Sequence, residues 1–192
     1  MPIVEVKGSA IKDTLDALTQ RVGADGLARI LGMMKPESSR ALEKPLASLW
    51  YPLDAFTELL EIDIRETAGG NEKELITRSE AVIDRQLRGI YRVFIRVGSP
   101  EFVIKRIASV HETYFRGVHA EARIVPPNEA FVRYAGFSKQ HRIIEYAILG
   151  FYKKALEISG ARNVLAAVTK SVAEEAGYAE VRLRWSNPRA DT

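Results

Sequence analysis

The chain has 192 residues, of which 46% are hydrophobic and 28% charged. A chain of this length and composition can bury a hydrophobic core that is stable without disulfide or metal cross-links. Its 28 basic and 25 acidic residues are interspersed and give a formal net charge of +3, so the balance does not by itself indicate a polyanion-binding protein. There is no cysteine, which excludes disulfides, thiolate metal sites and a cysteine-based mechanism.

No window approaches the roughly 18 consecutive apolar residues of a membrane span. The first residues, MPIVEVKGSAIKD, lack the charged-then-apolar pattern of a signal peptide. We therefore expect a soluble cytoplasmic protein without a membrane span. A single globular domain is predicted over residues 1–185, followed by a flexible tail over 186–192 that contains a proline.

The first third of the chain is predicted to be mostly helical. Residues 3–6 alternate as a short opening strand, and a helix follows the Gly8-Ser9 break until Gly23 stops it. A second helix covers residues 24–33, and Pro36 opens a third.

The aromatic pair Trp50-Tyr51 precedes another predicted helix. Asp54 is expected to cap this helix, and Gly69-Gly70 ends it. The two aromatic side chains would act as anchors under the helix start, or they would line a ligand pocket.

Residues 72–97 form the longest helical pattern, with apolar residues such as Ile83 and Phe94 on one face. The opposite face would be a solvated charged face paired with nearby acids, or it would contact an acidic partner. Its five arginines are Arg78, Arg85, Arg88, Arg92 and Arg96.

Gly98-Ser99-Pro100 marks the start of a further helix that ends at Arg116-Gly117. His111 lies late in this helix, and a metal or haem role would need partner residues at short spacing, which are absent. Neither a metal site nor a cofactor is predicted.

The rest of the chain predicts a hairpin, a helix and a second hairpin. The first hairpin joins residues 119–125 to 129–135 through Pro126-Pro127-Asn128, and the helix covers 139–159. The closing hairpin covers 163–185, and its last strand alternates between an apolar and a polar side. The predicted fold is α+β: a helical N-terminal half packed on an antiparallel sheet of two hairpins, about four strands with a possible N-terminal fifth.

Four stretches of the chain resemble a myxobacterial paralogous family of uncharacterised proteins of about two hundred residues. They are KGSAIKDTLDAL, SLWYPLDAF, YRVFIRVGSPEFVIKRIASVHETYFRG and GARNVLAAVTKSVAEEAGYAEVRLRW. The resemblance covers nearly the whole chain. Its most specific motifs are Trp-Tyr-Pro near residue 50, the Gly-Ser-Pro-Glu step and the closing strand that ends at Trp185.

The closing hairpin is also similar to the 4-vinyl reductase-type domains, which are distantly akin to haem-based nitric-oxide sensors and to vesicle-tethering subunits with an acyl-binding cavity. This resemblance implies an α+β fold, often dimeric, with an apolar pocket between helices and sheet. Many such domains carry two cysteines in the closing hairpin. Ser171 and Ala179 occupy the matching positions here, which removes any metal or redox role of those cysteines.

The sequence lacks a phosphate loop, a Gly-x-Ser-x-Gly motif and a histidine pair at i, i+4, so no enzyme activity is predicted. Two hypotheses remain. The first is a non-catalytic sensory domain with an apolar pocket between the 139–159 helix and the sheet. The second is a homodimeric interaction module without a ligand, whose arginine face contacts an acidic partner.

Nucleic-acid binding through these arginines is a weaker alternative. The candidate pocket residues are large aromatics, which would otherwise be plain core: Trp50, Tyr51, Phe94, Phe115, Phe151 and Tyr152.

Overall fold

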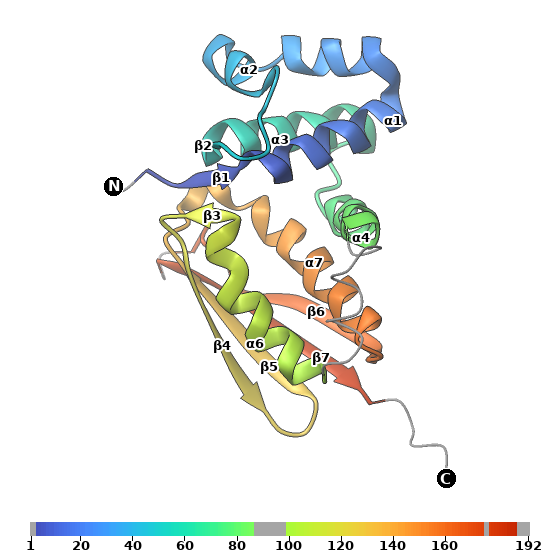
Figure 1. Cartoon of the computed structure of the whole chain (residues 1–192), viewed down its shortest axis with the longest axis vertical. Coiled ribbons are helices and arrows are strands. Elements are labelled where there is room, and N and C mark those ends of the chain that lie inside the picture. The colour runs from blue at the N-terminus through green and yellow to red at the C-terminus, as the bar shows by residue number, and fades with distance from the viewer. Residues whose placement is uncertain (1–2, 87–98, 175–176, 188–192) are drawn as a thin grey trace.

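The structure is a computed structural model that describes residues 3–86, 99–174 and 177–187. It has a helical part and an α/β part, which lie one above the other in Figure 1. The helical part holds α1 (Gly8–Gly32), α2 (Pro36–Leu42) and α3 (Leu53–Ala68). The α/β part holds α4 (Glu74–Gln86), α6 (Pro100–Val110), α7 (Ile144–Ile158) and a four-stranded sheet.

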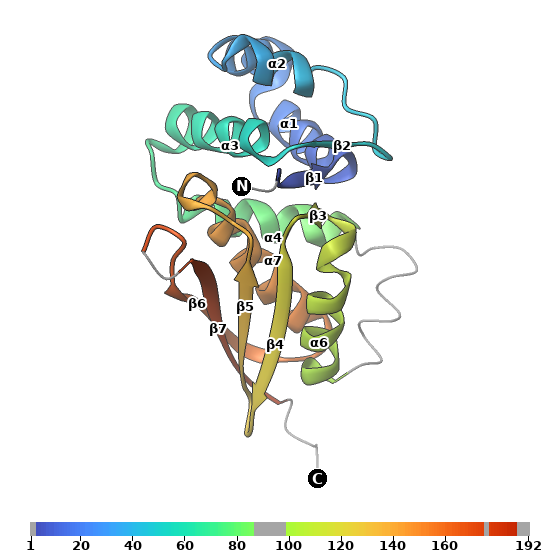
Figure 2. The same cartoon turned by 90° about the vertical axis from the view of Figure 1, so that its left-hand side faces the viewer.

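The sheet is built from the two predicted hairpins, and the predicted α+β class is confirmed. Its strands are β4 (His119–Val125), β5 (Glu129–Ala135), β6 (Arg162–Lys170) and β7 (Tyr178–Ser186), all antiparallel in the order β4-β5-β7-β6. Helices α6 and α7 lie along the same face of the sheet, and α4 lies beside α7 (Figure 2).

Alternation along the strands decides which side chains enter the core. On β5, Val132 and Tyr134 are buried against the helices, whereas Arg133 between them is exposed. The partner strand β7 follows the same rule, and Val181 lies opposite Val132 in the register. This period of two places the apolar half of each strand under the helices.

The opening strand is real, but the expectation that it forms a fifth strand of the main sheet is wrong. β1 (Glu5–Lys7) pairs with β2 (Trp50–Pro52) and β3 (Phe115–Arg116) in a separate three-stranded sheet. The chain begins at the junction between the two parts, away from the edges of the main sheet (Figure 1). The backbone N–H and C=O groups of β1 therefore find their hydrogen-bond partners in β2 and β3.

Two predicted helices differ in detail from the observed ones. The first two predicted helices form one element, α1. It is kinked at Gly23, where they were predicted to separate, because this residue has a non-helical φ of 74°. The predicted 139–159 helix begins instead with a 3-10 turn, η2 (Lys139–His141), before α7. Of the predicted 72–97 helix, residues 87–97 lie outside the described part.

Both parts contribute to one hydrophobic core. Leu18 and Leu59 from the helical part and Tyr152 and Leu183 from the α/β part are fully buried within it. Within the described residues, the helices are too short or too polar to cross a membrane.

Candidate functional site

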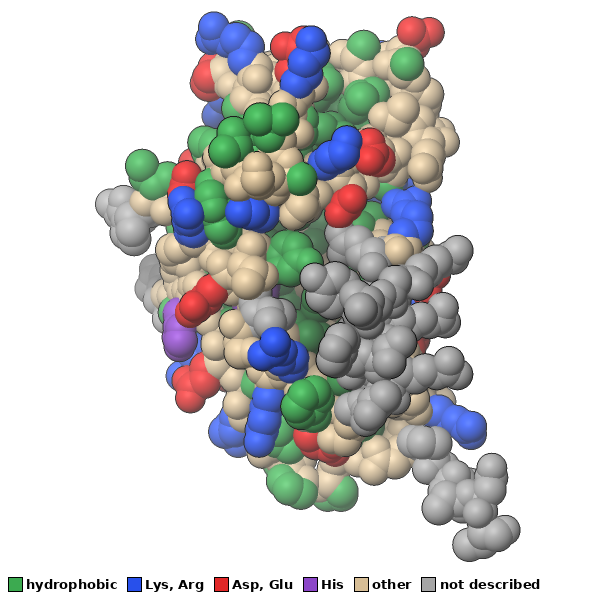
Figure 3. All heavy atoms as spheres, in the orientation of Figure 1, with side chains coloured by type: hydrophobic (Ala, Val, Ile, Leu, Met, Phe, Trp, Pro, Cys, Tyr) green, Lys and Arg blue, Asp and Glu red, His purple; other side chains and the backbone are tan. Residues whose placement is uncertain are grey.

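A cavity of about 140 Å³ lies where the helical part meets the α/β part. Its wall takes side chains from α1, α3, α4, α6, α7 and β5, and most of them are apolar. Figure 3 shows hydrophobic side chains in a recess between the two parts. The predicted pocket lies between α7 and the sheet. The cavity does take part of its wall from α7 and from Tyr134 of β5, but it also extends to the helices of the helical part.

An aromatic cluster forms one wall of the cavity. The His111 ring stacks on Phe115, with ring centroids 4.7 Å apart and an interplanar angle of 18°. Tyr134 approaches the same ring to 4.6 Å at 56°. His111 is the C-cap residue of α6, and Phe115 follows four residues later in β3. The chain turns between them, which brings the Phe115 ring onto the His111 imidazole.

His111 is a buried base in the cavity wall. Its Nε2 atom is inaccessible to solvent and has no hydrogen-bond partner among the described residues. Burial disfavours the charged imidazolium and lowers the pKa of His111 to about 3. The ring is therefore neutral at physiological pH, and its Nε2 atom can accept or donate one hydrogen bond, depending on the tautomer.

Two buried tyrosines that line the cavity join the sheet to α7. The Tyr134 hydroxyl donates to the Tyr152 hydroxyl at 2.9 Å, and both side chains are fully buried. Burial raises the pKa of both phenols, so both stay protonated. The pair satisfies polar groups in the core and fixes two aromatic walls of the cavity.

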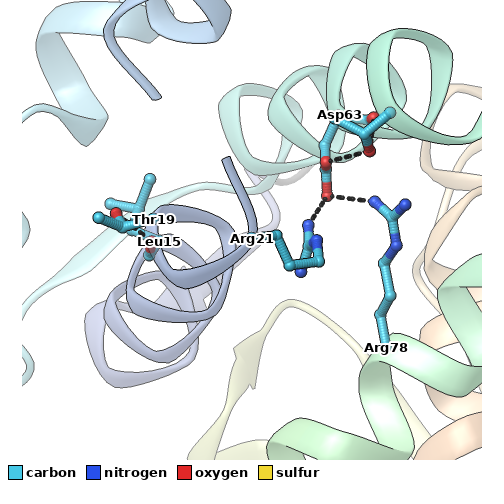
Figure 4. A network of polar contacts seen from close by, with 6 residues as sticks. Leu15, Thr19, Arg21, Asp63 and Arg78 are labelled. Carbon is cyan, nitrogen blue, oxygen red and sulfur yellow. Dashed lines mark hydrogen bonds and ion pairs between the residues drawn. The ribbon is translucent and has the colours of Figure 1, made fainter. Parts of the chain in front are cut away.

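A charged cluster forms another part of the cavity wall. The carboxylate of Asp63 on α3 receives Arg21 from α1 at 2.6 Å and Arg78 from α4 at 2.9 Å, both at Oδ2. Thr67 donates its hydroxyl to Oδ1 at 2.9 Å. Figure 4 shows the two guanidinium groups pointing towards the same carboxylate. Arg21, Asp63 and Arg78 all line the cavity.

The candidate aromatics separate into two groups. Phe115, Phe151 and Tyr152 line the cavity. Trp50 and Tyr51 lie away from it on β2, where Lys7 and Arg116 lie over the Trp50 ring and the Tyr51 hydroxyl accepts from the Leu46 backbone N–H at 2.8 Å. Phe94 lies outside the described residues.

The candidate arginine face is not one exposed surface. Arg78 turns inward and its side chain is only 12% exposed, because Asp63 of α3 offers it a buried carboxylate. Arg85 donates to Gln20 of α1 at 2.9 Å. Arg88, Arg92 and Arg96 lie outside the described residues. The expectation of a solvated or partner-binding face is therefore wrong for Arg78.

Sequence reasoning did not select His111 or Asp63 as site residues, although a signal was present for each. His111 lies four residues after Ile107 and four before Phe115, on the apolar side of its helix. Asp63 follows Phe56 and Leu60 at helical spacing, which places a carboxylate on an apolar face. A polar residue at a buried helical position requires a partner, and here the partners come from other elements.

Asp54, His141 and Ser138 form a chain of polar contacts that resembles a catalytic triad. His141 Nε2 lies 2.6 Å from Asp54 Oδ1, and His141 Nδ1 lies 3.3 Å from Ser138 Oγ. The Ser138 backbone N–H also donates to Nδ1 at 3.1 Å, so the imidazole completes a capping box for η2. These contacts connect η2 to α3. The prediction that Asp54 caps its own helix is wrong, because its carboxylate bonds to His141 instead.

The described residues offer no other obvious chemistry. Among them, no group of three or more His, Asp or Glu side chains could hold a metal ion. A second hollow of about 650 Å³ between α2 and α3 has a mixed lining that includes Glu58, Glu61 and Arg65. The 140 Å³ cavity is therefore the candidate site, because it combines an apolar wall with buried polar groups.

No known family and no curated protein matches this sequence. Solved structures do match its fold. An H-NOX protein from K. algicida in the Fe(II) unliganded form has a TM-score of 0.73 at 14% identity, covering 97% of this chain and 100% of that one. An H-NOX protein from S. oneidensis in the Fe(II)NO state has a TM-score of 0.72 at 11% identity, covering 94% and 99%.

An oxygen-binding H-NOX domain related to soluble guanylate cyclases, in its oxygen complex, has a TM-score of 0.65 at 14% identity and covers 95% of this chain and 96% of that one. The likeness extends over nearly the full length of both chains in each case. At these identities it establishes a shared fold.

Proposed function

We propose that this chain is a non-catalytic sensory domain that binds a small, largely apolar molecule in the cavity between its helical and α/β parts. The observation that carries the proposal is the cavity itself: about 140 Å³, with mainly apolar walls and a few buried polar groups. Ligand sites are typically built in this way. The shared fold supports the proposal, since the matching H-NOX structures are described with Fe(II), nitric oxide or oxygen.

The position of the cavity suits a sensory role. Its walls come from both parts of the molecule, so a ligand would contact α1 and α3 on one side and α7 on the other. Ligand binding shifts an equilibrium between two arrangements when the ligand contacts one arrangement better than the other. A molecule at this junction would favour one relative placement of the two parts and thereby change the surface offered to a partner.

Haem is the cofactor that the resemblance to nitric-oxide sensors implies, and the residues do not fit it. His111 has a buried nitrogen that no described residue hydrogen-bonds, as an axial ligand requires. The space beside it is too small: 140 Å³ is close to the roughly 150 Å³ of a cavity that holds benzene, whereas a porphyrin contains several pyrrole rings. Phe115 also stacks on the imidazole at 4.7 Å.

The first test is native mass spectrometry of the purified protein, followed by solvent extraction. A retained small molecule supports the proposal and identifies the ligand. The same spectrum reports the oligomeric state and so examines the competing hypothesis of a ligand-free homodimeric interaction module. If the purified protein carries no ligand, a titration with a small apolar molecule tests whether the cavity can bind one.

The second test titrates ligand-free protein with toluene and follows the melting temperature. A ligand that binds only the folded state at about 100 times its Kd stabilises that state by about 2.7 kcal/mol. The Ala147→Phe variant, which adds a ring to the cavity wall, should lose most of this response. The control Ala167→Phe lies on an exposed position of β6 and should keep it. No retained ligand, together with no response of the wild type to toluene, benzyl alcohol, benzoate or hexanoate, contradicts the proposal.

A further inference from the structure

The charged wall of the cavity contains more positive than negative charge. Two guanidinium groups, Arg21 and Arg78, share the one carboxylate of Asp63, and both approach its Oδ2 atom. Arginine stays protonated at all relevant pH values. The cluster therefore carries one surplus positive charge next to an apolar space.

Burial makes this surplus costly. The side chains of Asp63 and Arg78 are 2% and 12% exposed. The Arg78 Nη1 atom is inaccessible to solvent, and its ion pair at 2.9 Å is with Asp63 Oδ2, the same oxygen that Arg21 contacts. A buried cation without full pairing is unfavourable, because the low-dielectric surroundings replace water that would solvate it.

The rest of the cavity wall does not neutralise the charge. Asp63 is the only acidic residue among the described residues that line the cavity. Residues 87–98, outside the described part, include no Asp or Glu in their sequence. The His111 imidazole, which also lines the cavity, is neutral, and further polar lining groups include the hydroxyls of Thr14 and Ser79.

We propose that the ligand is a small amphipathic monoanion, a carboxylic acid whose carboxylate pairs with Arg78 and Arg21 and whose apolar part fills the cavity. This inference rests on the proposed function and specifies the class of ligand. One surplus cation matches one carboxylate. A guanidinium group binds a carboxylate with directed, charge-assisted hydrogen bonds, and the side chains of both Arg21 and Arg78 line the cavity.

The dimensions of the cavity limit the apolar part of the ligand. About 140 Å³ accommodates one six-membered ring or a short alkyl chain, and not a long-chain fatty acid in full extension. The aromatic wall of Phe115 and Tyr134 suits the face or edge of a ring. Benzoate and hexanoate are therefore suitable probes.

The test is calorimetric titration of ligand-free protein with benzoate and with benzyl alcohol, which has a similar shape and no charge. Benzoate should bind at least ten times more tightly than benzyl alcohol. Equal affinities would overturn the inference and leave the proposed function standing. Binding of neither probe, nor of hexanoate or toluene, would overturn both.

Variants examine the assigned partners. Arg78→Gln should weaken benzoate binding at least tenfold and leave the affinity for benzyl alcohol nearly unchanged. Arg65→Gln is the control, since Arg65 lies on α3 with a side chain that is 60% exposed and does not line the cavity. If Arg78→Gln does not fold, Arg21→Gln carries the test, because the Arg21 side chain is 33% exposed and tolerates replacement better. Unchanged benzoate affinity in the folded variant contradicts the inference.

Discussion

At the scale of single residues, His111 is the most unusual position of the candidate site. The sequence places it on an apolar helix face, and the tertiary structure encloses its ring between Phe115 and Tyr134. A histidine in such surroundings is stable only as the neutral base. Burial lowers its pKa from about 6.5 to about 3, which couples the stability of the fold to pH.

The direction of this coupling follows from the protons bound in each state. Between pH 6.5 and about 3 the unfolded chain binds a proton at His111 and the folded chain does not, so stability falls as the pH falls through this window. From pH 6.5 to pH 5 the loss attributable to His111 is about 2 kcal/mol.

Urea unfolding of the wild type and of His111→Phe at pH 7 and pH 5 measures this loss. The variant keeps an aromatic ring in the stack and cannot be protonated, so its stability should fall less between the two pH values. His119→Phe, at an exposed position, should behave like the wild type. Identical pH dependence in all three proteins would contradict the assignment.

At the scale of elements, the contact between α4 and α7 depends on a glycine. Gly150 lies in the middle of α7, where a Cβ atom would come within 2.3 Å of the Ile76 carbonyl oxygen and 2.8 Å of the Ser79 Cβ. Glycine in a helix interior normally costs stability, so its presence here reflects the close approach of the two helices. Because α4 and α7 both line the cavity, this contact also positions its walls.

Gly150→Ala should therefore destabilise the protein by about 1–3 kcal/mol, since the added methyl group collides with backbone and the helices must separate. Gly32→Ala is the matched control, because a Cβ atom at the last residue of α1 meets nothing within 4 Å. The control should be neutral or slightly stabilising. Chemical denaturation of both variants compares the two sites, and equal effects would show that the α4–α7 contact is not limiting.

At the scale of the whole molecule, the Asp63 carboxylate connects α1, α3 and α4 across the junction of the two parts (Figure 4). Its two arginines come from positions 42 residues before and 15 residues after it in the chain. Removing the carboxylate leaves two guanidinium groups facing one another with no anion between them. The ion cluster therefore holds together elements that the backbone hydrogen bonds do not join.

Asp63→Asn should lower the unfolding free energy by about 3 kcal/mol, as expected when one member of a buried ion cluster is lost. Glu66→Gln is the control on the same helix, since its pairing with Arg65 is largely exposed and should contribute less than about 1 kcal/mol. Thermal and urea unfolding measure both. A loss for Asp63→Asn no larger than for Glu66→Gln would contradict the connecting role of the cluster.

The elements of this protein were largely predictable because their signals are local. Pro126-Pro127-Asn128 marks the turn between β4 and β5, and the alternation over residues 178–185 assigns the inner and outer sides of β7. Ser99 at the start of α6 accepts from the Phe102 backbone N–H at 3.3 Å, as its sequence position indicates. Periodicity, turn residues and caps depend on a few neighbouring residues, so they can be derived from the chain alone.

The pairing of distant residues was decided by the tertiary structure alone. The sequence indicated a strand at the N-terminus, but only the fold shows that β1 joins β2 and β3 at the junction. It grouped Arg78 with four other arginines on one helix face, and only the fold brings Arg78 against Asp63 of α3. The sequence pattern can indicate that a charged residue is buried or that a strand needs a pairing strand. It does not indicate the partner of either, because that partner is brought close by contacts between residues far apart in the chain.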